Sequence, residues 1–409
     1  MLKRLAVFTT LLSVATAAWS AGEPIRIALI EQMSGPFANI GLSAKHAFDA
    51  EFSALNEKGG VLGRQLELVP FDSHGNPQDA ALQVQAASDQ NIRYVIQGSG
   101  SNLAHAILDA VVKHNARSPD DPIVYLNHGA LDPTLTEEKC SFWHFRFVPH
   151  GHMIVSALTD AIASDKRVRQ VYLINQDYAW GRSVAADARS MLAARRPDIR
   201  VVGEDLHPIG KVKDFASYVA KAAAAKADTI ITGNWGNDLA LLIRAIRDAG
   251  LQAEIYAPLA GLKGAPTSIG EAGADRVKAV LFWHENVDPN TLIPFAMNYR
   301  ARYDEDWNWL PNVVLPEMLA RAMVEAGTTN PASVARALEG LRYPGPTGEI
   351  WMRPDDHQIM MPMFQTIFTK AGVPGVKYDA EKTGFGWKTQ GKVDTGQIVS
   401  PVLCKVERP

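Results

Sequence analysis

The sequence predicts an α/β protein built from two units, each a parallel sheet covered by helices. From Pro24 onward, short runs rich in β-branched and aromatic residues alternate with helical runs, the pattern typical of parallel sheets. The chain of 409 residues also exceeds what a single hydrophobic core usually organises. The alternation occurs in two consecutive sets, and each set predicts its own sheet.

The first set of elements begins directly after Pro24. Asn76 is placed to cap a helix that has Pro77 at its first position. Gly59 and Gly60 end the preceding helix. The predicted strands are 25–32, 65–72, 94–97 and 123–126, and the predicted helices are 42–56 and 77–90.

The second set follows a passage, 141–151, that contains Pro149 and Gly151 and is the predicted first crossing between the units. Its predicted strands are 170–175, 201–206 and 229–233, with helices 181–194, 215–225 and 238–249. A further strand starts at 277, and the later helices 292–303, 313–326 and 332–341 are placed on the first unit. The predicted division is 21–148 and 281–362 for the first unit, and 149–280 and 363–409 for the second, with the C-terminal tail.

The N-terminus, 1–20, has the form of a secretory signal peptide. Lys3 and Arg4 precede an apolar run, 5–14, and Ala18-Trp19-Ser20 offers a small-x-small cleavage site. The apolar run is too short to span a bilayer of about 30 Å. We therefore expect a soluble, exported protein located in the periplasm.

Composition excludes several partners. Without Lys3 and Arg4, 39 basic residues face 44 acidic ones, so the mature chain is mildly acidic and unsuited to nucleic acid. His144, His150 and His152 match no strong metal signature, and no nearby cysteine or carboxylate completes a site. We expect no metal and no cofactor.

The chain has two cysteines, Cys140 and Cys404. An oxidising compartment makes a disulfide between them a candidate. The alternative is two separately buried thiols, because sequence does not show whether they are close enough to bond.

The stretch QGSGSNLAHA, 97–106, places small residues ahead of a predicted helix. It lacks the lysine of a phosphate-binding loop and the glycine-x-serine-x-glycine spacing of a nucleophile elbow. Ser99, Gly100 and Ser101 instead suit a small anion such as a carboxylate, because backbone amides at a helix start are free to donate. The alternative is a serine-rich helix cap without a ligand.

Several stretches together resemble the branched-chain amino acid class of periplasmic solute-binding proteins of ABC transporters. Near the start these are IALIEQMSGPFANIG and FDAEFSALNEKGGVLGRQLELVPFDSHGNPQDA, followed by LNHGALDPTLT, LINQDYAWGRSV and IRAIRDAGL. The likeness runs from about 25 to 363. It implies two doubly wound parallel-sheet lobes joined by a three-crossing hinge, with the ligand in the cleft between them.

The resemblance also implies roles for individual residues. In the first lobe the ligand carboxylate would be held by Ser99 and by backbone amides at Gly129, Ala130 and Leu131. In the second lobe Tyr178 and Asp238 would contact the ligand, with Asp238 neutralising an ammonium group; its alternative is an acid that favours the helix dipole.

The sequence departs from the family at two of these positions. Leu131 replaces a hydroxyl residue, and Asp238 is one methylene shorter than the usual glutamate. Aromatic and imidazole side chains beside the predicted pocket loops could stack on a planar ligand, or could pack between loop and sheet. These are His128, Trp235, Trp283 and His284. An aromatic carboxylate is therefore the alternative ligand class.

The expected function is the substrate-binding component of an ABC importer. A monomer would capture a small hydrophobic carboxylate-bearing solute, a branched-chain or related amino acid, and deliver it to an inner-membrane permease. The alternative is an extracytoplasmic sensor that reports ligand occupancy to a signalling partner. An enzyme is not expected, because the sequence shows no complete nucleophile-base or metal set.

Overall fold

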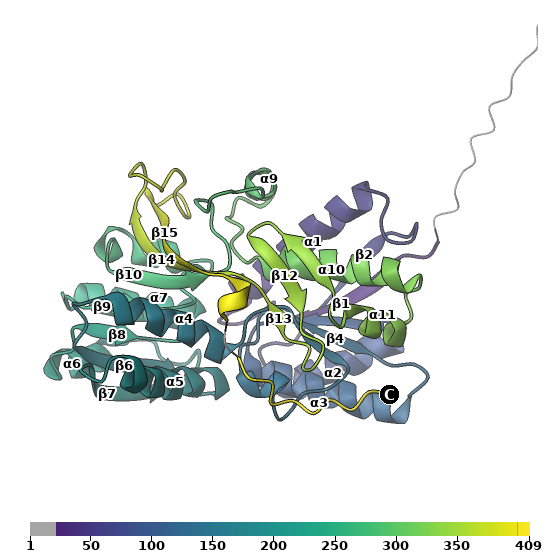
Figure 1. The fold of residues 1–409 in the computed structure, drawn as a ribbon, viewed down its shortest axis with the longest axis horizontal. Helices are drawn as coiled ribbons and strands as arrows, with labels where there is room; N and C mark the ends of the chain where they lie inside the picture. The colour runs from purple at the N-terminus through teal and green to yellow at the C-terminus, as the bar shows by residue number, and fades with distance from the viewer. Residues whose placement is uncertain (1–21, 399) are drawn as a thin grey trace, which may run out of the picture.

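The computed structural model describes residues 22–398 and 400–409, and these form two α/β units side by side (Figure 1). The predicted signal peptide, 1–20, lies outside the described residues. No helix in the described part of the chain is long and apolar enough to cross a membrane.

The first unit contains a five-stranded parallel sheet in the order β2-β1-β3-β4-β5. Its strands are β1 (Ile25–Glu31), β2 (Leu66–Asp72), β3 (Tyr94–Gln97), β4 (Val124–Asn127) and β5 (His144–Arg146). Its helices are α1 (Ala38–Glu57), α2 (Pro77–Asp89), α3 (Ser101–Arg117), α10 (Pro311–Ala326) and α11 (Pro331–Leu338). As predicted, the Asn76 side chain caps α2 by accepting from the amides of Gln78 and Asp79.

The second unit contains a seven-stranded sheet in the order β15-β14-β10-β9-β8-β6-β7, in which the β10–β14 and β14–β15 pairs are antiparallel. Its strands are β6 (Gln170–Gln176), β7 (Arg200–His207), β8 (Thr229–Ile231), β9 (Glu254–Tyr256), β10 (Val277–Leu281), β14 (Met363–Lys370) and β15 (Phe385–Val393). Its helices are α4 (Gly151–Ser164), α5 (Ala179–Arg195), α6 (Ala216–Ala224), α7 (Gly236–Asp248) and α8 (Ala265–Ile269).

A small third sheet continues the first unit beside β5. Its strands are β11 (Arg342–Gly345), β12 (Gly348–Met352) and β13 (Ile359–Met360), and Arg146 forms a parallel bridge with Gln358. The chain crosses between the units after β5, between β10 and α9 (Ile293–Tyr303), and between β13 and β14. The two-sheet α/β fold predicted from the sequence is confirmed, whereas β5, β9 and α4 were not predicted.

The C-terminal tail returns from β15 to the first unit (Figure 1). Cys404 is joined to Cys140 by a disulfide, across a sequence separation of 264 residues. Arg408 Nε donates to Glu339 Oε1 at 2.8 Å, beside α11. The tail is thus a further connection between the units.

The central strands β1, β3 and β4 of the first sheet are mostly apolar and buried because helices cover both faces of the sheet. In β1, Ile27, Leu29 and Ile30 are fully buried, and β3 and β4 are buried along their whole length. Parallel strands end at a common edge, so the turns after β1, β3 and β4 meet there.

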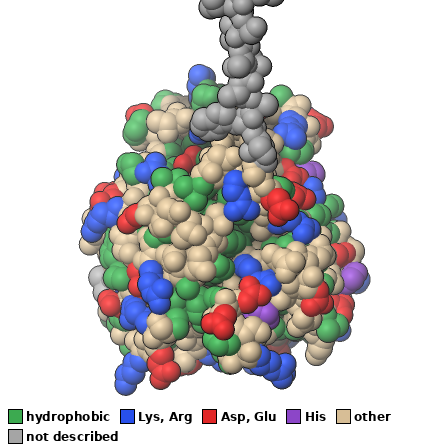
Figure 2. Space-filling view, turned by 90° about the vertical axis from the view of Figure 1, so that its right-hand side faces the viewer, with side chains coloured by type: hydrophobic (Ala, Val, Ile, Leu, Met, Phe, Trp, Pro, Cys, Tyr) green, Lys and Arg blue, Asp and Glu red, His purple; other side chains and the backbone are tan. Residues whose placement is uncertain are grey.

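On the face shown in Figure 2, basic and acidic side chains are interspersed rather than gathered by sign.

Candidate ligand-binding site

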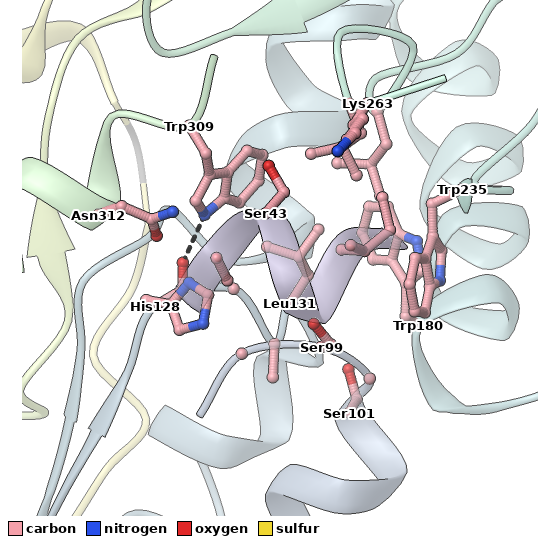
Figure 3. A pocket seen from close by; sticks show the side chains of 18 of the residues that line it. Ser43, Ser99, Ser101, His128, Leu131, Trp180, Trp235, Lys263, Trp309 and Asn312 are labelled. Atoms are coloured by element: carbon pink, nitrogen blue, oxygen red, sulfur yellow. Dashed lines mark hydrogen bonds between the residues drawn. The ribbon is translucent and has the colours of Figure 1, made fainter. Parts of the chain in front are cut away.

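A cavity lies between the two units, at the carboxyl ends of their strands (Figure 3). The first unit contributes α1 and the turns after β3 and β4, and the second contributes the turns after β6, β8 and β9. Its lining residues are Ile40, Ser43, Ala44, Gly98, Ser99, Gly100, Ser101, His128, Gly129, Ala130, Leu131, Tyr178, Trp180, Trp235, Leu259, Leu262, Lys263, Asn308, Trp309 and Asn312.

The turn after β3 ends in the N-terminus of α3, as predicted. Gly100 has a φ of 94°, a left-handed conformation that glycine adopts without strain, and no side chain caps the helix. Ser101 Oγ accepts from the amide of Asp132 at 3.2 Å, so its hydroxyl hydrogen is free to donate into the cavity. Hydroxyls and helix-start amides therefore face the same space, as anion binding requires.

A buried carboxylate, Glu31, joins this turn to the next one. Its Oε1 accepts from the amide of Gly98 at 2.8 Å, from the amide of Ser99 at 3.2 Å and from His128 Nε2 at 2.7 Å. A Cβ at Gly98 would lie 2.6 Å from His128 Nε2, so the two turns touch. Sequence reasoning missed Glu31, although an acid at the end of a buried strand was a signal for it.

The turn after β4 lines the cavity, but two of its amides are already engaged. Asn127 Oδ1 accepts from Gly129 at 3.0 Å and from Ala130 at 2.8 Å. Among the described residues, the amide of Leu131 has no protein acceptor. Of the three backbone amides that the resemblance implied, Leu131 is the one open to a ligand.

The second unit presents an aromatic wall. Trp235 Nε1 donates to the Tyr178 hydroxyl at 2.8 Å, and burial raises the pKa of Tyr178 above its usual value. Tyr178 thus keeps its proton, which can be donated to a ligand. Trp180 Nε1 donates to the carbonyl of Gly233 at 2.8 Å, and Trp235 packs on Phe37 of the first unit with ring centroids 4.3 Å apart.

Three predicted residues lie outside the cavity. Asp238 is buried; its Oδ2 accepts from Gln176 Nε2 and from the amide of Gly210, both at 2.8 Å, and its Oδ1 has no protein partner. Trp283 and His284 border a separate hollow. Burial lowers the pKa of His284 to about 3, and its Nε2 lies 2.9 Å from Thr389 Oγ1.

Several lining residues were not predicted. Trp309 and Asn312 come from the segment before and at the start of α10, and Trp309 Nε1 donates to the carbonyl of His128 at 2.8 Å. The dense tryptophan and asparagine pattern WNWLPN, 307–312, was the available signal. Lys263 follows β9 and forms an ion pair with Glu305. Burial lowers the pKa of Lys263.

The arrangement suits the binding of a small organic anion. Within the residues that the structure describes, no cluster of three or more histidine, cysteine or acidic side chains could hold a metal ion. The cavity offers hydroxyls and free amides to an anion, and aromatic rings to an apolar body.

Comparison with known proteins identifies the class. A family model described as periplasmic binding protein matches residues 24–372. The chain is 34% identical to Leu/Ile/Val-binding protein homolog 4 of Brucella abortus, over 97% of this chain and 96% of that protein. It is 30% identical to a leucine-, isoleucine-, valine-, threonine-, and alanine-binding protein from Brucella ovis, whose closed crystal structure gives a TM-score of 0.84 over 94% of this chain and 100% of that one. The chain belongs to the periplasmic binding protein family.

A more distant structure shares the fold alone. It is a solute-binding protein of an ABC transporter from Rhodopseudomonas palustris, in complex with 3,4-dihydroxybenzoic acid, at 17% identity and a TM-score of 0.79 over 91% of this chain and 98% of that one. Membership confirms the resemblance drawn from the sequence. The family is one of solute-binding proteins rather than enzymes, with small-molecule ligands and a membrane permease as partner.

Proposed function

We propose that this chain is the substrate-binding component of an ABC importer, and that it captures a small hydrophobic carboxylate-bearing solute in the cavity between its units. The main support is the uncapped N-terminus of α3, where Ser99, Ser101 and helix-start amides face the cavity. A partly buried carboxylate there gains from the helix field and from charge-assisted hydrogen bonds. The names of the Brucella relatives point to aliphatic amino acids.

An aromatic acid is the second candidate, and a specific feature favours it. Trp180, Trp235 and Trp309 all line the cavity, and together they could enclose a planar ring. The Rhodopseudomonas palustris protein of the same fold holds a dihydroxybenzoic acid. Both candidates share the carboxylate, so the α3 site serves either.

Closure would couple binding to delivery. The cavity is lined from both units, and the Phe37–Trp235 contact joins them. A ligand favours the closed form only to the extent that it binds that form better than the open one. A solute that touches both walls meets this condition. The closed, loaded monomer would then dock on its permease in the periplasm, after export through the signal peptide.

Binding by purified protein tests the proposal. A thermal-shift screen would use leucine, phenylalanine, 2-hydroxy-4-methylpentanoate, 3-phenyllactate, benzoate and 4-hydroxybenzoate; a ligand at about 100 times its Kd stabilises by about 2.7 kcal/mol. Ser99→Ala and Ser101→Ala should each raise the Kd of the best ligand about tenfold, because each removes a charge-assisted hydrogen bond.

Ser118→Ala is the matched control, since Ser118 caps the opposite end of α3. It should leave the Kd unchanged. Unchanged affinity in both Ser99→Ala and Ser101→Ala would reject the carboxylate site.

A further inference from the structure

The cavity contains no carboxylate. Its polar lining consists of hydroxyls, two amide side chains, His128 and Lys263, and no aspartate or glutamate of the described residues lines it. The undescribed positions, 1–21 and 399, carry no acidic residue in the sequence. A solute with an ammonium group would therefore meet no counter-charge among the side chains of this cavity.

The nearby acids are buried and bound to other donors. Asp238 Oδ2 is held by Gln176 and by the backbone amide of Gly210; its Oδ1 is buried without a protein partner, but the residue does not line the cavity. Asp132 Oδ2 accepts from His105 Nε2 at 2.6 Å and from Thr134 Oγ1 at 3.0 Å.

The other two acids are bound in the same way. Glu31 Oε1 ties the turns after β3 and β4 together through three donors, while its Oε2 is buried without a protein partner. Glu305 receives His46 Nδ1 at 3.0 Å and is also bonded to Lys263 and to the hydroxyl of Tyr299. Neither acid lines the cavity, and turning either one toward a ligand would break the hydrogen bonds that hold it.

Two of the residues that line the cavity each have a buried polar atom without a protein partner. His128 is 4% exposed and Asn312 is 3% exposed, and both His128 Nδ1 and Asn312 Oδ1 are buried and unpartnered. His128 Nε2 faces the Glu31 carboxylate at 2.7 Å, so Nε2 carries the hydrogen and Nδ1 of the neutral ring accepts. The asparagine oxygen is also an acceptor. Both side chains lie on the Trp309 side of the cavity in Figure 3.

These observations call for a ligand that donates hydrogen without carrying positive charge. An ammonium group could donate to both acceptors, but its charge would be buried without a counter-ion, which costs several kcal/mol. A hydroxyl supplies the donor without that penalty. We propose that the solute is an organic acid with a hydroxyl and no ammonium group, its carboxylate at α3 and its hydroxyl beside His128 and Asn312, where its single hydrogen is donated to one of the two acceptors. This deepens the proposed function and rests on it.

Matched acids test the inference by isothermal titration. The hydroxy acids 2-hydroxy-4-methylpentanoate and 3-phenyllactate differ from leucine and phenylalanine only in the group that replaces ammonium. The tighter of the two should bind at least about 100-fold more tightly than its amino counterpart. If 4-hydroxybenzoate binds more tightly than both, its hydroxyl should give it about a tenfold advantage over benzoate, because benzoate has no hydrogen to donate to either acceptor.

A charge substitution tests the assignment of the residues. Asn312→Asp places a carboxylate beside the unpartnered acceptors, so it should shift the hydroxy-to-amino preference toward the amino acid by at least about tenfold. The control is Asn298→Asp, which makes the same change at an exposed position on α9. It should leave the preference unchanged.

The outcomes separate this inference from the proposed function. If leucine or phenylalanine binds as tightly as its hydroxy counterpart and Ser99→Ala still weakens binding, the inference is overturned while the function stands. If no acid of either kind binds, both fail. If the preference is unaltered in Asn312→Asp, the placement of the hydroxyl at Asn312 is wrong.

Discussion

Replacing Gly98 by alanine would separate the two turns that form the first unit's side of the cavity. The new Cβ would lie 2.6 Å from His128 Nε2 and 2.7 Å from the backbone nitrogen of Gly129. Neither neighbour can move freely, because His128 is bonded to Glu31 and Gly129 donates to Asn127. Overpacking of this kind costs about 1–3 kcal/mol. If the overpacking destabilises the ligand-bound form by this amount relative to the free form, the Kd rises about 5- to 150-fold.

Intrinsic fluorescence is a suitable assay, since Trp180, Trp235 and Trp309 line the cavity and should respond to occupancy. Titration would use the best ligand of the panel, with circular dichroism to verify that Gly98→Ala is folded. Gly396→Ala is the matched control, because a Cβ there meets nothing within 4 Å. The reasoning is refuted if folded Gly98→Ala protein binds with the Kd of the unmodified chain.

Three further predictions concern stability and the aromatic wall. Burial, with a neighbouring carboxylate, raises the pKa of Glu51 to about 8, so the free energy of unfolding should fall as pH rises from about 4.5 and level off above about 8. Glu51→Gln should therefore raise the free energy of unfolding by on the order of 3 kcal/mol at pH 9 and by little at pH 5. An equal gain in Tm at the two pH values would contradict this. Replacing Cys140 and Cys404 together by serine should destabilise by about 2–5 kcal/mol in chemical denaturation, because it frees the tail; an unchanged midpoint would count against a stabilising disulfide. Trp235→Phe keeps an aromatic ring but removes the N–H that donates to the Tyr178 hydroxyl, so it should raise the Kd of the best ligand about fivefold in a titration. An unchanged Kd would show that Tyr178 binds the ligand without this hydrogen bond.

Much of the fold was readable from the sequence, because the signals for its elements are local. Asn76 and Pro77 mark the start of α2 through a cap and a fixed backbone angle, and the structure has both. The strands of the parallel sheets stood out as apolar runs bounded by turn residues. Periodicity and turn chemistry depend on neighbours in sequence, so they are visible without coordinates.

The elements that were missed look like loops in sequence. The three-residue strand β5 carries His144 and Arg146, both buried. The charge of Arg146 is tolerated in the core because its Nε donates to Gln358 Oε1 at 2.8 Å. Gln358 lies more than 200 residues further along the chain. Helix α4 starts at Gly151, directly after Pro149. Proline and glycine are typical of turns, so this stretch was predicted as a crossing and the apolar run after it was not recognised as a helix.

At the site, the sequence indicated which turns line the cavity, and the tertiary structure decided what each side chain does there. Ser99 and Tyr178 line the cavity, whereas Asp238 lies outside the lining and bonds Gln176. Trp309 joins the cavity from another part of the chain. A motif fixes where the backbone runs, but whether a buried polar group is free for a ligand depends on hydrogen-bond partners that only packing brings within reach.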